Sequence, residues 1–238
     1  MNCFNGEIYL KGSLKDEILI STYICHPSMA NNELSGPCLS IFLSKWLSNL
    51  KNRKFSYRFI FIPETIGSIY YIYKNFKNIK KNIKTILNMT CVGDNKNTSI
   101  LLSKYANTFA DKILLKVLKK NKIKYKKYNW LDRGSDERQY MSAGVNIPTI
   151  SLMSSKYREY SEYHTSDDNL NFISPNGLLK NFNLYRKLIL EIEKIELPVS
   201  KHLCEPNLSK RNLYPDHKLS KKNKLFKKYS KNLLNFLS

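Results

Sequence analysis

The 238-residue sequence lacks the features that mark membrane-spanning and secreted proteins. No apolar run approaches the roughly 18 residues that cross a bilayer. The first residues, MNCFNGE, contain neither a basic nor an apolar stretch, so we expect no secretory signal. The five cysteines form no CxxC pair and no regular framework, which is typical of reduced thiols in a cytoplasmic protein. Three of them lie in apolar stretches, and we interpret these as small core residues: Cys25, Cys38 and Cys91.

Acidic residues are also few, with 19 Asp and Glu against 40 Lys and Arg, which gives a net charge of +21. A charge of this size is typical of proteins that bind nucleic acid or an anionic membrane surface. The chain is equally crowded with Asn, Ile, Tyr and Phe, the residues of A/T-rich codons, so genome composition accounts for much of the lysine. No nucleic-acid motif accompanies the charge. We therefore favour composition, and polyanion binding is the weakest of three functional hypotheses.

Apolar segments alternate with amphipathic ones, and we find no internal repeat. The pattern predicts strands at residues 17–23, 57–62, 85–92, 99–103, 123–130 and 147–153. It predicts helices at residues 35–50, 66–76, 109–118, 135–142 and 175–196. Strands that alternate with helices indicate an α/β fold with a parallel or mixed sheet. Leu197 and Pro198 break the pattern, so we expect an α/β domain over residues 1–198 and a basic linker or tail over 199–238.

Two of the four histidines follow predicted strands. His26 comes directly after the first strand, and His164 lies in a polar loop after the strand at 147–153. In open α/β sheets, ligands gather beyond the carboxyl ends of the strands. Two histidines at that edge would converge on one metal ion, and zinc favours imidazole and carboxylate ligands. A hydrogen-bonded loop histidine is the commoner alternative for each residue alone.

Two further segments are open to a catalytic or a structural interpretation. Glu64 follows a very apolar strand and opens a helix, where it serves either as a general base beside a metal-bound water or as a helix N-terminal charge. The segment DRGSDERQ at residues 132–139 places alternating charges in a turn. It provides either a helix cap at Ser135 with local ion pairs, or contacts to a substrate.

Taken in order, the motifs HPSMANNELSGP, PETIGS, TCVGD, RGSDERQY and EYHTSDDNL resemble one family. They are similar to the aminopeptidase-like proteins of the zinc-peptidase clan, and more closely to a subgroup found in bacterial polysaccharide-biosynthesis loci. The resemblance covers residues 6–214. It implies a three-layer α/β/α fold with a mixed central sheet, one Zn2+ ion at the strand ends, and a small peptide or another amide-containing molecule as substrate.

The resemblance also implies roles for individual residues. It places His26, Asn32 and His164 at the metal-ligand positions and Glu64 at the position of the general base. At position 32 the family pattern has an aspartate, and an amide is a poorer zinc ligand than a carboxylate. In the wider clan a second acidic ligand follows the base, whereas this chain has Thr65 there. We therefore expect one weakly held zinc ion, or none.

The resemblance assigns Asp168 to support of the metal ligands. The functional interpretation of the segment at 132–139 assigns Arg133, Asp136 and Glu137 to contacts with a substrate or to support of the ligands. Similar proteins are longer, with a further N-terminal segment and a winged-helix domain after a linker like residues 204–215. On this comparison we expect a sheet incomplete on its N-terminal side, a tail that begins a missing winged-helix domain, and complementing fragments of a split or frameshifted gene as partners. The second hypothesis is accordingly a catalytically impaired binding module of the same family.

Overall fold

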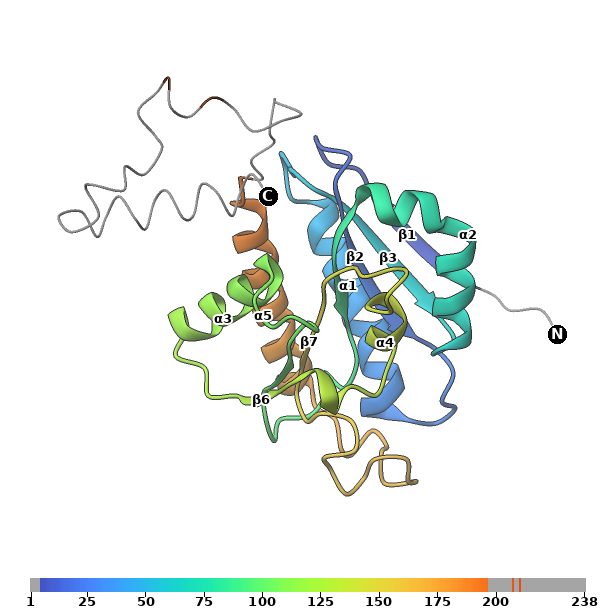
Figure 1. The fold of residues 1–238 in the computed structure, drawn as a ribbon. Helices are drawn as coiled ribbons and strands as arrows, with labels where there is room; N and C mark the ends of the chain where they lie inside the picture. Colours follow the sequence, from blue (N-terminus) through green and yellow to red (C-terminus); the bar gives the residue numbers. More distant parts are fainter. Residues whose placement is uncertain (1–4, 197–206, 208–209, 211–238) are drawn as a thin grey trace, which may run out of the picture. The chain divides into compact units, whose positions relative to one another are not determined.

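The computed structural model describes residues 5–196, 207 and 210, and its centre is one seven-stranded sheet. Its strands are β1 (Gly6–Leu10), β2 (Glu17–Tyr23), β3 (Ser56–Ile62), β4 (Ile83–Asn88), β5 (Ser99–Leu101), β6 (Lys126–Tyr128) and β7 (Thr149–Met153). They are ordered β1-β3-β2-β4-β7-β5-β6 (Figure 1). Strands β3, β2, β4 and β7 run parallel, while β1 is antiparallel to β3 and β5 to β7. The predicted mixed sheet is confirmed.

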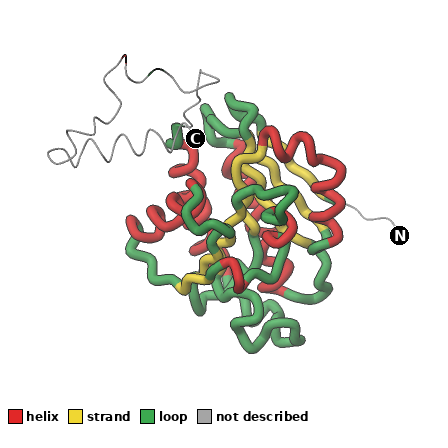
Figure 2. Tube along the Cα trace, in the orientation of Figure 1, coloured by secondary structure: helices red, strands yellow, loops and turns green. Residues whose placement is uncertain are grey.

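Helices cover both faces of the sheet (Figure 2). One layer contains α1 (Ser35–Ser48), α3 (Phe109–Lys120) and α5 (Pro175–Glu193), and α5 packs against both of the others. The other layer contains α2 (Ile66–Asn82) and the single turn α4 (Glu137–Tyr140), which are in contact with each other. The three-layer α/β/α arrangement predicted from the family resemblance is therefore confirmed.

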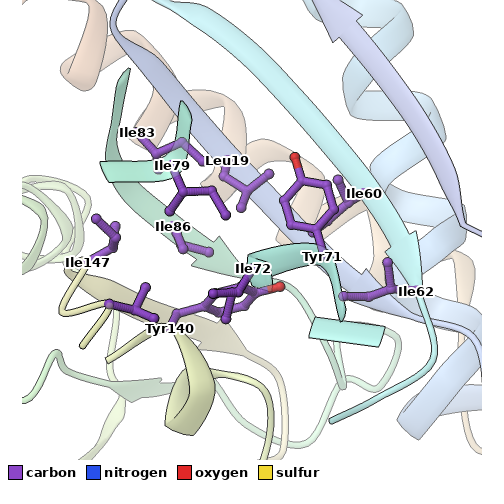
Figure 3. Close-up of a cluster of buried hydrophobic side chains, with 11 residues drawn as sticks. Leu19, Ile60, Ile62, Tyr71, Ile72, Ile79, Ile83, Ile86, Tyr140 and Ile147 are labelled. Atoms are coloured by element: carbon purple, nitrogen blue, oxygen red, sulfur yellow. The ribbon is translucent and has the colours of Figure 1, made fainter. Parts of the chain in front are cut away.

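The core between the sheet and α2 is aliphatic with two tyrosines (Figure 3). Tyr71, Ile72 and Ile79 share the inner side of α2 because they are spaced at helical intervals. They meet Leu19 and Ile86, which project from two neighbouring parallel strands. Burial of these side chains fixes α2 on the sheet, so that the segment just before it, at the end of β3, is held in place.

The sequence located most elements but not all of their bounds. Strand β1 was not predicted, because an edge strand with one exposed face gives no buried apolar run. The strand expected at 85–92 ends at Asn88, and the helix expected at 135–142 is only one turn long. The strand predicted at 123–130 is present as the shorter β6, which lies at the edge of the sheet and has Lys126 and Lys127 exposed.

The remaining expectations concern the domain boundary with its basic tail and the membrane-spanning helices. The domain boundary predicted after residue 198 and the basic tail lie outside the described residues, apart from positions 207 and 210. Among the helices that the structure describes, none combines the length and the apolar character needed to cross a bilayer.

Candidate metal centre

The parallel strands bring the main predicted site residues to one edge of the sheet. The loops after β2, β3 and β7 carry His26, Glu64 and His164. The ring centroids of the two histidines are 5.1 Å apart, and His26 Nε2 lies 3.9 Å from Glu64 Oε2. The side chains of His26 and Glu64 are 23% and 22% exposed, so they are reachable from solvent. The structure thus assembles these three residues into one partly open site.

Glu64 is held by a tight turn at the end of β3. Thr65 has φ 62° and ψ −64°, and the Ile66 N–H donates to the Glu64 carbonyl at 2.7 Å. These values define a γ-turn with positive φ, a strained conformation for a β-branched residue. The Ser135 hydroxyl donates to Glu64 Oε1 at 2.6 Å. Together, the turn and Ser135 fix the direction of the Glu64 carboxylate and leave Oε2 facing His26.

Asp136 stabilises this turn from the opposite segment. Its Oδ1 accepts hydrogen bonds from the Thr65 N–H at 2.7 Å and from the Ser68 hydroxyl at 2.8 Å. The side chain is fully buried, and within the described part of the chain Oδ2 has no hydrogen-bond partner. Burial raises the pKa of Asp136 to about 7. Asp136 therefore holds the backbone of the turn that follows Glu64.

Glu137 is also fully buried, and four donors surround its carboxylate. Oε1 accepts from the N–H groups of Gly134 and Ser135 at 2.7 and 2.8 Å, and from the Tyr157 hydroxyl at 2.8 Å. Oε2 accepts from the Asn88 side chain at 2.9 Å. This network fixes the turn that presents Ser135 to Glu64.

Arg133 is half-buried and contacts its own segment. Its guanidinium lies 4.8 Å from the ring centroid of Trp130 and donates to the Trp130 carbonyl at 3.1 Å. The structure records no contact between Arg133 and the three convergent residues in the part of the chain it describes.

Asp168 links the loop that carries His164 to the turn that carries Asn32. This turn is a short π-helical segment, Ala30–Leu34, that runs directly into α1. Asp168 is fully buried and accepts hydrogen bonds from the N–H groups of Asn31 at 2.6 Å and Asn32 at 3.0 Å. Its carbonyl accepts from the Ala30 N–H at 2.8 Å. Asp168 thus satisfies the N–H groups at the start of this helical segment, as a helix cap does.

The Asn32 side chain is buried, and its amide oxygen is already occupied. Oδ1 accepts hydrogen bonds from the Tyr23 hydroxyl at 2.8 Å and from the Cys91 thiol at 3.7 Å, which engage both of its lone pairs. Nδ2 has no hydrogen-bond partner among the described residues, and an amide nitrogen that carries two hydrogens offers no lone pair to a metal. In this orientation Asn32 contributes no free ligand atom.

Cys25 was wrongly predicted to be a core residue, because its thiol is exposed at the site. Cys91 is buried as predicted, and Cys38 is half-buried. Cys25 Sγ lies 3.1 Å from His26 Nδ1 and accepts from the Glu64 N–H at 3.3 Å. The signal that would have identified it is its position beyond the end of β2, next to a histidine.

Cys25, His26 and Glu64 each offer one ligand atom, and these atoms lie within 4.8 Å of one another. Thiolate, imidazole and carboxylate are the three ligand types of protein zinc sites, so the residues present fit zinc. Burial lowers the pKa of His26, which keeps the ring neutral and able to donate a lone pair. The neighbouring His164 ring is exposed and stacks on Tyr163, with 3.9 Å between the centroids.

The fold is similar to that of zinc aminopeptidases and of glutaminyl cyclases. A zinc aminopeptidase from Bacillus subtilis superposes with a TM-score of 0.66 at 17% identity, over 81% of this chain and 50% of that one. A glutaminyl cyclase from an Acidobacteriales bacterium gives a TM-score of 0.67 at 18% identity, over 81% of this chain and 74% of that one. At these identities the comparison establishes the fold.

The chain belongs to the family described as a domain of unknown function (DUF4910), whose model matches residues 2–196. A Clostridium acetobutylicum protein is 44% identical over 210 residues and is named as a polysaccharide biosynthesis protein with an aminopeptidase-like domain. A crystal structure described as a peptidase from the same species gives a TM-score of 0.78 at 38% identity. The chain spans 48% of the first protein and 59% of the second, while 88% and 98% of the chain itself are covered. The family resemblance read from the motifs is confirmed.

Proposed function

We propose that the chain is a zinc-dependent, aminopeptidase-like hydrolase that cleaves a peptide or amide bond and acts in the biosynthesis of a cell-surface polysaccharide in the cytoplasm. The observation that carries the proposal is the convergence of His26, Glu64 and His164 at the ends of parallel strands. The names of the C. acetobutylicum relatives support the hydrolase class and the link to polysaccharide synthesis.

The chemistry divides between the metal and the protein. A zinc ion held at this site would polarise the scissile carbonyl and activate a water molecule. His26 and His164 would hold the ion, and Glu64 would take the proton of the attacking water and return it to the leaving amine. Glu64 Oε2 is the oxygen suited to this transfer, because Oε1 is engaged by Ser135. In this proposal Asp136, Glu137 and Asp168 position the site, while Arg133 contacts the substrate.

The test combines metal analysis with turnover of aminopeptidase substrates by the purified, folded protein. We expect one zinc ion per chain and a kcat about 100- to 10,000-fold lower in Glu64→Gln, whose amide keeps the shape of the carboxylate but cannot accept the proton. Asn32→Asp introduces a carboxylate and is expected to bind zinc more tightly than the natural chain. Absence of zinc, together with turnover that is unaffected by Glu64→Gln, would refute the proposal.

The occupied amide at Asn32 favours a second candidate, a binding module of the same family without turnover. Folded natural protein that shows no turnover, while Asn32→Asp gains both zinc and turnover, would identify this impaired form. Robust hydrolysis by the natural chain would exclude it.

A further inference from the structure

We propose that Cys25 is a ligand of the metal ion, and that its thiolate supplies the negative charge that the amide of Asn32 cannot supply. This inference rests on the proposed zinc site and adds a residue to it. The ligands become Cys25, His26 and His164, while Glu64 remains the base. Three protein ligands leave the fourth position of a tetrahedral zinc ion open to water, as catalytic sites require.

The distances at the site are close to those of a tetrahedral ligand set. Zinc bonds of about 2.0 Å to nitrogen and 2.3 Å to sulfur separate two tetrahedral ligands by roughly 3.3–3.8 Å. The Cys25 Sγ to His26 Nδ1 distance is 3.1 Å, and the ligand atoms of Cys25, His26 and Glu64 lie within 4.8 Å of one another. The His164 ring lies beside the His26 ring, with 5.1 Å between centroids. His164 therefore lies beside the group formed by Cys25, His26 and Glu64, and its side chain would turn towards that group to complete the ligand set.

The charges around the thiol favour a cation there. Glu64 lies beside His26, the Glu33 carboxylate accepts from the His26 backbone N–H, and Asp136 lies behind Thr65. Glu33 and Asp136 are both engaged with backbone N–H groups, so the Cys25 thiol and the Glu64 carboxylate are the groups that face the His26 ring. On binding, the sulfur–metal bond forms as the S–H bond breaks, and the proton passes to solvent.

A thiolate ligand has a spectroscopic signature that imidazole and amide ligands lack. Cadmium is the probe, because sulfur ligands select soft ions and the cadmium–thiolate bond absorbs in the ultraviolet. Titration of the purified chain with Cd2+ is expected to give a charge-transfer band that saturates at one equivalent. Cys25→Ser should abolish the band and weaken zinc binding about tenfold or more. Cys38→Ser, which alters a half-buried thiol on α1, is the matched control and should retain both.

Alkylation of the natural chain tests the same contact without a substitution. One equivalent of zinc should protect the exposed Cys25 from iodoacetamide, as measured by mass spectrometry of its peptide. Metal that binds without a thiolate band and without protection of Cys25 would overturn the Cys25 assignment and leave the zinc hydrolase standing. Folded protein that binds neither ion would overturn both proposals.

Discussion

The Thr65 N–H donates a hydrogen bond of 2.7 Å to Asp136 Oδ1, and this bond joins two segments that are distant in the sequence. It holds the γ-turn that follows Glu64, while the neighbouring Ser135 holds the Glu64 carboxylate itself. The orientation of the candidate base therefore depends on a pair of adjacent residues, Ser135 and Asp136, that never touch the substrate in the proposed mechanism.

Asp136→Ala leaves two buried donors without their acceptor, the Thr65 N–H and the Ser68 hydroxyl. We expect the free energy of unfolding to fall by about 1–3 kcal/mol in urea denaturation. Asp136→Asn keeps an oxygen at the same place and is expected to lose less. Equal losses in the two variants would contradict the acceptor role.

The positive φ of Thr65 predicts a stabilising substitution. Thr65→Gly removes the steric cost of φ 62° and is expected to raise the free energy of unfolding by about 1 kcal/mol, since glycine adopts this region freely. Thr65→Ala retains a Cβ atom and should bring no such gain. Urea midpoints of the three proteins measure the difference, and a less stable glycine variant would contradict it.

The raised pKa of Asp136 predicts how stability depends on pH. Burial lifts this pKa from its ordinary value of 3.8 to about 7, so between these values the folded state binds more protons than the unfolded state. The contribution of Asp136 to stability is therefore fully present near pH 4 and lost as the pH rises towards 7. Asp136→Asn removes the titrating group and should flatten this part of the stability profile. If the stability of the natural protein and of Asp136→Asn changed with pH in the same way from pH 4 to 7, the raised pKa would not belong to Asp136.

Asp168 and its neighbour Asp167 offer a matched pair. Asp168 is buried and accepts from two backbone N–H groups of the turn that carries Asn32, whereas Asp167 is exposed. Asp168→Ala is expected to cost about 2–4 kcal/mol, because hydrogen bonds to a charged group contribute about 1.5–3 kcal/mol each and their effects overlap. Asp167→Ala should stay within about 0.5 kcal/mol of the natural protein. Thermal or urea unfolding measures both.

The sequence predicted those parts of the fold in which burial is nearly complete. Every residue of β2 and β7 is buried, and both strands stand out as apolar runs. The edge strand β1 has no such run, and its pairing with β3 depends on the whole sheet. The helix α4 is a single turn, Glu137–Tyr140, and the Glu137 carboxylate accepts from the N–H groups of Gly134 and Ser135 just before it, a contact that the sequence pattern did not indicate.

The site was predictable where it follows from strand ends. His26, Glu64 and His164 converge because parallel strands end at the same edge. The hydrogen bond from Tyr23 to Asn32 was not predictable, since it depends on how two buried side chains face each other. The thiol of Cys25 was misassigned because it lies in an apolar stretch of the chain, although it follows the end of β2 at Tyr23 and is exposed.

The parallel pairing of β3 with β2, of β2 with β4 and of β4 with β7 has a consequence for how the protein folds. The candidate ligands come from loops that are brought together only after non-local strands have paired, a slow kind of contact to form. An unfolded chain therefore presents no preformed centre, and the affinity of the folded chain for an ion adds directly to the stability of the whole sheet. Saturating zinc should accordingly slow the unfolding of the entire α/β domain, and a chelator should restore the faster rate.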